Sequence, residues 1–273
     1  LRSVDMGNGV KTIGTFGFSG CNELTSITLS ENLTEIGESA FNQCSTLTEL
    51  ALPDSVVTIG NGVFASCSKL KQVTLPNGLT SISESMFSDC SALTSVEIPD
   101  SVTSIEYRAF KSCSKLQQIS LPDGLTTIGE GAFYSCSGLE QITFPEGLTS
   151  MGASAFYNCS GLVQVTLPNG LTSTGKEVFS GCSSLTSAEI PEGFTALADG
   201  TFSNCSSLTD VKLPNSLQQI GNGAFWDCDA LTEITIPGNV TDIYGSAFAK
   251  CDGLTSIVIP VSYTHLTLPT NRE

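Results

Sequence analysis

The sequence is poor in the groups that most enzymes, membrane proteins and nucleic-acid-binding proteins need. It has one histidine, His265, and no run of about 18 apolar residues, so imidazole catalysis and membrane insertion are not expected. Only 11 Lys and Arg residues stand against 27 Asp and Glu, which gives a net charge of −16. This charge repels phosphate backbones, so we expect no nucleic-acid partner. The 40% apolar content of the 273 residues nevertheless suffices for a buried core.

Common catalytic and metal-binding motifs are also missing. There is no Gly-x-Ser-x-Gly, no His-Glu-x-x-His and no Cys-x-x-Cys. Gly60-x-Gly62-x-x-Ala65 fits a relaxed dinucleotide fingerprint, but this turn recurs along the chain without the strand-turn-helix unit that binds a pyrophosphate. Asp100, Asp123 and Glu146 predict a column of solvated charge rather than a calcium site, because no EF-hand loop accompanies them. We therefore expect a non-enzymatic protein without cofactor or metal.

What the sequence has instead is a repeat of 23 residues without a single insertion. A phenylalanine stands three residues before each of eleven cysteines, and a leucine stands three residues after it. Six and eight residues after each cysteine the chain is usually aliphatic, a period of two that predicts a strand, and a proline then ends it. Ser30 replaces the first of these prolines. The cysteines are Cys21, Cys44, Cys67, Cys90, Cys113, Cys136, Cys159, Cys182, Cys205, Cys228 and Cys251.

The remaining part of each repeat predicts one closed coil. A polar turn such as Asp123-Gly124 reverses the chain, and a segment such as Gly129-Glu130-Gly131-Ala132-Phe133 is expected to make one helical turn. One coil buries too little apolar area to fold alone, so neighbouring coils must stack. The predicted fold is a β-rich, right-handed solenoid of short parallel strands, with twelve strand segments from Val4 to Ile259.

The pattern Leu-x-x-Ile-x-Leu-Pro-x-x-Leu-x-x-Ile-Gly-x-x-Ala-Phe-x-x-Cys resembles the BspA-type, or treponemal-type, leucine-rich repeat of 23 residues. The resemblance covers residues 1–260 and implies a microbial cell-surface or secreted protein that adheres to host matrix or to other cells. We therefore expect a macromolecule-binding module whose partner is a protein or another macromolecule. The alternative is a structural spacer that presents other domains of a longer surface protein.

Both ends of the chain depart from the repeat. Leu1 lies in the middle of a coil, so we expect a truncated N-terminus. Residues 261–273 lose the Gly, Phe and Cys positions abruptly and resemble translated vector sequence more than a capping repeat. We interpret this tail as non-native.

The cysteines allow three interpretations: disulfides, a metal site or a ladder of buried thiols. Equivalent Cβ atoms in neighbouring coils should lie about 4.8 Å apart, whereas a disulfide needs about 3.8 Å. We therefore predict that all eleven are reduced and packed as small apolar side chains. Packing should be weakest near residues 172–202, where Thr174 and Ala188 replace larger aliphatic residues and Ala198 replaces a turn glycine.

Aromatic residues mark the candidate partner contacts. Tyr134 and Tyr157 stand two residues before their cysteines in adjacent coils, and Trp226 occupies the same position three coils later. Large amphipathic rings are typical of binding hot spots, although these rings could instead shield the edge of the coil. The predicted strand face carries mainly Ser, Thr and Gln and offers no such anchor. A basic cluster is interpreted as solvated surface; it consists of Lys69, Lys71, Arg108, Lys111 and Lys115.

Overall fold

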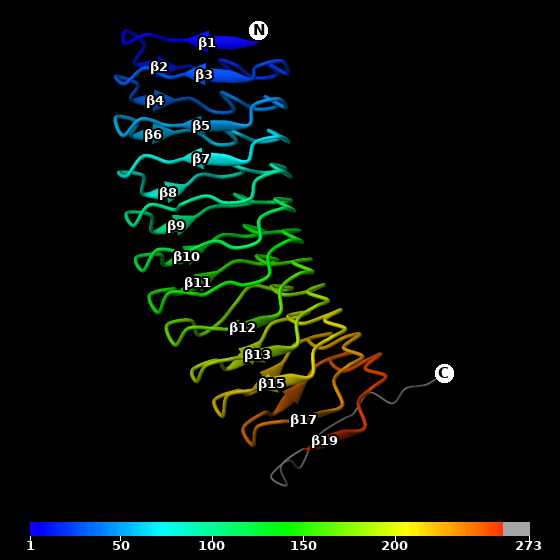
Figure 1. Cartoon of the computed structure of the whole chain (residues 1–273). Coiled ribbons are helices and arrows are strands. Elements are labelled where there is room, and N and C mark those ends of the chain that lie inside the picture. The colour runs from blue at the N-terminus through cyan, green and yellow to red at the C-terminus, as the bar shows by residue number, and fades with distance from the viewer. Residues whose placement is uncertain (259–273) are drawn as a thin grey trace.

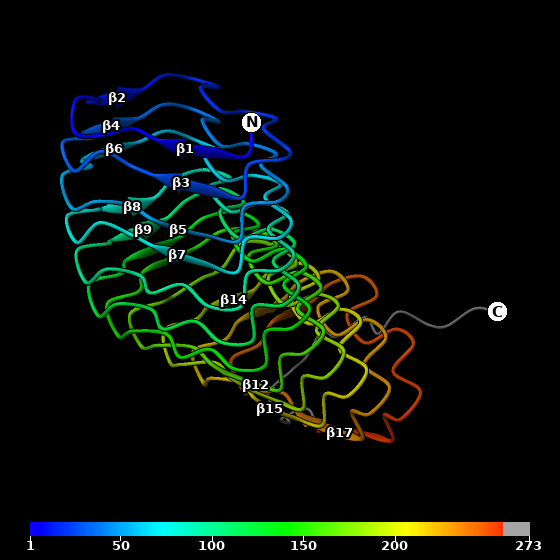
Figure 2. The ribbon, with the colours of Figure 1, turned by 45° about the horizontal axis from the view of Figure 1, so that its top comes forward.

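Each repeat forms one coil, and the coils stack in sequence order from the N-terminus (Figure 1). The computed structural model describes residues 1–258, so Ile259 and the tail 261–273 lie outside the described part. The stack bends and twists toward its C-terminal end, and the coils fan out on the side of the turns that follow the prolines (Figures 1 and 2). These turns, nine to twelve residues after each cysteine, are called the Pro turns below.

Three-residue strands form one face of the stack, the long-strand face. In each strand the central side chain points inward and its two neighbours point outward, as the period of two predicts. The strands are β1 (Ser3–Asp5), β3 (Ser26–Thr28), β5 (Glu49–Ala51), β7 (Gln72–Thr74), β12 (Gln164–Thr166), β13 (Ser187–Glu189), β15 (Asp210–Lys212), β17 (Glu233–Thr235) and β19 (Ser256–Val258).

Two-residue strands follow the Pro turns and form the opposite side, the short-strand face. Most end on an inward-pointing isoleucine. They are β2 (Thr12–Ile13), β4 (Glu35–Ile36), β6 (Thr58–Ile59), β8 (Ser81–Ile82), β9 (Ser104–Ile105), β10 (Thr127–Ile128), β11 (Ser150–Met151), β14 (Ala196–Leu197), β16 (Gln219–Ile220) and β18 (Asp242–Ile243).

All strand pairs are parallel, and the register is one repeat. Ser3 pairs with Ser26, and Thr127 pairs with Ser150. Equal repeat length therefore places every residue beside its equivalent in the next coil, and the predicted solenoid of parallel strands is confirmed.

A column of stacked phenylalanine rings runs through the core between the two faces. Successive rings from Phe18 to Phe248 are nearly parallel, with centroids 5.1–5.8 Å apart. From Phe41 to Phe225 these rings are fully buried, so each coil removes its neighbour's ring from water.

The helical turn expected before each cysteine does not form, and this prediction was wrong. Within residues 1–258 the segment consists of hydrogen-bonded turns. Two residues per coil adopt positive φ, for example Ser39 at 53° and Gln43 at 60°, and a right-handed helix cannot contain them. The amide of Phe41 instead donates to the carbonyl of Val63 in the next coil, at 2.9 Å.

The expected twelve strand segments were also too many. The long-strand face has no strand at residues 95–98, 118–121 or 141–144, where a single bridge between Gln118 and Gln141 remains. These three segments lie in consecutive coils, between β7 and β12 (Figure 1). In these coils the central inward side chains, such as Val96 and Ile119, stay buried although the regular backbone pairing is lost.

We expect Thr174→Ile to stabilise the protein. The short-strand face is interrupted at Ser173 and Thr174, between β11 and β14, where Thr174 replaces the larger apolar residue of the other coils, Met151 and Leu197 in the two neighbours. Added apolar volume in this position should raise the free energy of unfolding by about 1 kcal/mol, and Ala188→Val in β13 by a similar amount. Urea denaturation measures both. Unchanged stability would mean that the neighbouring coils have already closed over the missing methyl groups.

Candidate functional site

Tyr134 and Tyr157 lie side by side on the edge formed by the turns before each cysteine. Their rings stack with centroids 4.8 Å apart and an interplanar angle of 11°. Both side chains are half-buried. Inter-coil hydrogen bonds hold their backbones, since the carbonyls of Tyr134 and Tyr157 accept from Ser112 and Ser135 at 2.7 Å each. The structure therefore brings together the two tyrosines predicted from the sequence.

Trp226 lies on the same edge but three coils away, so it does not join the tyrosine pair. Its ring is half-buried, and the Lys250 ammonium of the next coil sits 4.4 Å from the ring centroid. Such a contact uses one face of the indole in a cation–π interaction. The three predicted residues thus form two separate surfaces.

A further aromatic residue, Tyr107, was missed by the sequence argument. The Arg108 guanidinium lies 4.7 Å from the Tyr107 ring centroid. Arg108 also leans over Gly131 of the next coil, where a Cβ atom would come within 3.3 Å of Arg108 Cγ. The adjacent Tyr-Arg pair was the available signal, but Tyr107 does not occupy the position that Tyr134 and Tyr157 share. Of the basic cluster, Lys111 is half-buried and the other four residues are exposed.

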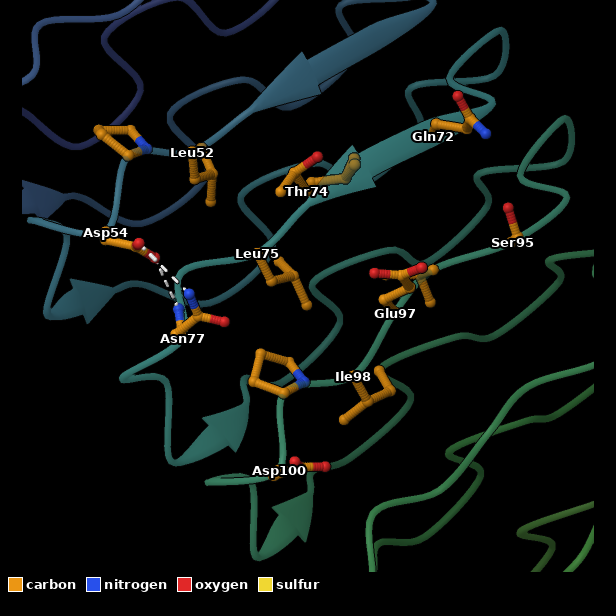
Figure 3. A pocket seen from close by; sticks show the side chains of 14 residues that line it. Leu52, Asp54, Gln72, Thr74, Leu75, Asn77, Ser95, Glu97, Ile98 and Asp100 are labelled. Atoms are coloured by element: carbon orange, nitrogen blue, oxygen red, sulfur yellow. Dashed lines mark hydrogen bonds between the residues drawn. The ribbon is translucent and has the colours of Figure 1, made fainter.

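Two grooves on the long-strand face were not predicted. The first groove, of about 660 Å³, is bounded by residues 52–54, 72–77 and 95–100 (Figure 3). The second groove, of about 570 Å³, lies between residues 118–123 and 141–146. Both lie where the long-strand face lacks regular strand pairing. The residues of segment 95–98 are of the same kinds as those in the paired strands, so the absence of a strand there could not be predicted from them.

Carboxylates on the Pro turns differ in whether they accept hydrogen bonds from the next coil. Asp54 accepts from the backbone and side-chain nitrogens of Asn77 at 2.9 and 3.3 Å (Figure 3). Glu192 accepts from the backbone amide of Asn215 at 3.0 Å, and this bond holds the pKa of Glu192 below its usual value. Asp100 and Asp123 are followed in the next coil by another acid instead of Asn, and neither has such a bond.

The cysteines form a ladder of hydrogen-bonded thiols. From Cys44 onward each Sγ donates to the carbonyl of the phenylalanine 26 residues earlier, at 2.9–3.3 Å. All eleven are free thiols, as predicted; ten are buried and Cys21 is half-buried. Burial raises the pKa of Cys44 to about 11 and those of Cys67 and Cys182 to about 12. Protonated, buried thiols of this kind are poor nucleophiles.

Residues 1–258 contain no group of three or more His, Cys, Asp or Glu side chains placed to hold a metal ion. The same part of the chain has no helix that could cross a lipid bilayer.

Stacked coils with parallel strands and an invariant aliphatic, phenylalanine and cysteine core define a leucine-rich-repeat solenoid. The family model described as BspA type leucine rich repeat region matches in six copies, over residues 1–117, 81–206 and 184–268. The chain therefore belongs to the BspA-type leucine-rich repeat family, as its repeat pattern had suggested. No curated protein sequence matches it.

Solved structures of bacterial leucine-rich-repeat proteins are similar to the chain in fold. A leucine-rich repeat protein from Bacteroides ovatus is 34% identical with a TM-score of 0.91, over 96% of this chain and 68% of that chain. A leucine rich cell surface protein from Faecalibacterium prausnitzii is 33% identical with a TM-score of 0.62, over 98% of this chain and 83% of that chain. The leucine-rich repeat protein of T. pallidum is 36% identical with a TM-score of 0.56, over 59% of this chain and 77% of that chain.

The buried thiols should resist modification in the native protein. We expect Cys21 to react first with a thiol reagent, because it alone is half-buried, and the other ten to react only after denaturation. Counting labelled cysteines by intact mass, with and without denaturant, tests this. A native mass lower by two hydrogens per cysteine pair would contradict the ladder of free thiols.

Alkaline pH should destabilise the fold. The pKa values of Cys67 and Cys182 are raised from 9.0 to about 12 in the folded state, so these thiols keep their protons while the unfolded chain releases them. Their contribution to stability is complete below about pH 8.5 and declines as pH rises toward 12. We expect the melting temperature to fall above pH 9, and to fall less steeply in the Cys67→Ala, Cys182→Ala variant. Equal slopes would show that other groups cause the decline.

Proposed function

We propose that this chain is a non-enzymatic macromolecule-binding module of a microbial surface or secreted protein. Membership of a repeat family and the relative named as a cell surface protein support this proposal. The stack is held together by contacts between neighbouring coils, so its surface residues are free to vary without loss of the fold. A protein or another macromolecule, host matrix included, is the proposed partner.

The stacked pair of Tyr134 and Tyr157 is the observation that carries the proposed binding surface. Two half-buried aromatic rings offer a large contact area for a partner and lose few rotamers on binding. Trp226 forms a second anchor on the same edge, and Lys250 beside it adds a positive charge. The long-strand face carries mainly Ser, Thr and Gln side chains. These contribute less free energy of binding, because each exchanges one hydrogen bond to water for another.

We expect the Tyr134→Ser, Tyr157→Ser, Trp226→Ser variant to bind its partner at least about tenfold more weakly, which corresponds to about 1.4 kcal/mol. The measurement is the Kd of the full chain for immobilised matrix proteins that it captures. Tyr244→Ser is the matched control, because Tyr244 is an aromatic residue that is 42% exposed but lies outside the shared position.

The melting temperature separates binding from edge packing. If the rings bind the partner, the melting temperature of the triple variant should stay nearly unchanged. If the rings only shield the edge of the coil, replacing them should lower the melting temperature and leave the Kd unchanged. Failure of the chain to bind any matrix or cell-surface macromolecule would favour the alternative, a spacer that presents other domains.

A further inference from the structure

The dipeptide Asn-Gly occurs in two kinds of turn, which differ in the hydrogen bonding of the glycine amide. All five asparagine side chains are exposed. Asn77-Gly78 and Asn169-Gly170 lie in Pro turns, and Asn8-Gly9 lies in the equivalent turn at the N-terminal end. Asn61-Gly62 and Asn222-Gly223 lie in the turns before a cysteine. One protein therefore presents the same dipeptide in two environments.

An asparagine followed by glycine can lose its side-chain amide without a catalyst. The glycine nitrogen gives up its proton and attacks Cγ of the asparagine, the Cγ–Nδ2 bond breaks, and ammonia leaves with that proton. Water then opens the succinimide ring to give aspartate or isoaspartate. Glycine favours this reaction because it has no side chain to hinder the attack. Ring closure moves the glycine nitrogen, so any hydrogen bond that this nitrogen donates must break first.

Hydrogen bonds between coils block this step in the turns before the cysteines. The Gly62 amide donates to the Glu84 carbonyl at 2.8 Å, and the Gly223 amide donates to the Gly245 carbonyl at 3.0 Å. Each bond joins two successive coils. The glycine nitrogen is therefore free to move only when the turn opens locally.

The glycine amides of the Pro turns are free. Those of Gly9, Gly78 and Gly170 donate to no group of residues 1–258. All three glycines are exposed, so water is their hydrogen-bonding partner. Attack by these nitrogens breaks no bond between coils.

Anchoring of the asparagine itself distinguishes Asn77 from Asn169. Asn77 donates to Asp54 from its backbone nitrogen at 2.9 Å and from Nδ2 at 3.3 Å (Figure 3). The Asn169 side chain makes one hydrogen bond within residues 1–258, from Nδ2 to Glu146 Oε2, and at 3.5 Å it is a weak one. Asn169 is therefore freer to bring its Cγ to the Gly170 nitrogen.

We propose that Asn169 is a site of spontaneous deamidation in the folded protein, whereas Asn61 and Asn222 are protected by the fold. Asn8 belongs to the reactive group, because the Gly9 amide is free as well. Asn77 reacts at an intermediate rate, because its glycine amide is free but Asp54 anchors its side chain.

Deamidation of Asn169 would change the surface of the Pro turns. Asn169 stands between Glu146 and Glu192, and all three lie ten residues after their cysteines. Asp100 and Asp123 hold the same position in the two coils before Glu146. A carboxylate at residue 169 therefore joins these acids into an unbroken row over five successive coils. The isoaspartate product also adds one methylene group to the backbone of the turn.

The test follows the five asparagines of one sample over time. The full chain is kept at about pH 8, where the buried thiols retain their protons, and mass spectrometry of its peptides measures the deamidated fraction of each Asn-Gly pair. We expect Asn169 to react at least about tenfold faster than Asn61 and Asn222, with Asn77 between them. Equal rates at Asn169 and Asn61 in the folded chain would overturn the proposal.

The unfolded chain is the matched control, because all five asparagines have glycine as the next residue. Urea removes the hydrogen bonds between coils, so the five rates should converge. A ratio that persists in urea would mean that the neighbouring sequence sets the rates, and the proposal would fail.

Two further measurements examine the cause of the difference. Amide hydrogen exchange should be slow at Gly62 and fast at Gly170. The Asp54→Ala variant should accelerate the deamidation of Asn77 and leave that of Asn169 unchanged. Slow exchange at Gly170 would contradict a free amide there, and an unchanged rate at Asn77 would contradict protection by Asp54.

Discussion

Contact between equivalent residues in neighbouring coils is the interaction on which the rest of this structure depends. A coil of 23 residues has two flat faces and no interior of its own, so its apolar side chains leave water only when another coil covers them. The phenylalanine column and the thiol ladder both act across this boundary. Each phenylalanine ring stacks on the next, and each phenylalanine carbonyl accepts a thiol from the following coil, as Phe18 does from Cys44. A cysteine suits this position because it fills a small apolar space and still satisfies a buried carbonyl.

This dependence explains why the 23-residue register is constant along the chain while the outward-facing residues vary from coil to coil. An insertion in any coil would shift every later phenylalanine out of its column, whereas a change in an outward residue alters only its own surroundings. The two faces differ in the continuity of their strand pairing. The short-strand face keeps its ladder from β8 to β11, and the same coils open on the long-strand face. Neighbouring coils therefore stay together without a continuous long-strand ladder, because the short-strand ladder, the hydrogen bonds between the turns and the packed core remain.

The structural features that recur in every coil could be predicted from the sequence. Features that depend on single residues, or on the bend of the whole stack, could not. The solenoid, the buried phenylalanines, the free cysteines and the pairing of Tyr134 with Tyr157 all follow from position within the repeat. The expected helical turn was wrong because two residues per coil, such as Ser39 and Gln43, adopt positive φ; the glycines that occupy the position of Ser39 in four other coils were the available signal. The missing strand at residues 95–98 could not be predicted, since Ser-Val-Glu differs little from the Gln-Val-Thr of β12. Bending of the stack is a sum over many coils, so no local window of sequence contains it.

Differences between neighbouring coils also matter in a protein whose repeats are nearly identical. Identical coils in a straight stack would present the same surface eleven times, with no position favoured over another. The coils are unequal, because the long-strand face is paired in some coils and unpaired in others, and because only some Pro-turn carboxylates have an Asn in the next coil. Asp54 has Asn77 beside it, whereas Asp100 has Asp123 in the next coil. Residue differences between neighbouring coils are therefore what distinguish one place on this one-dimensional array from another.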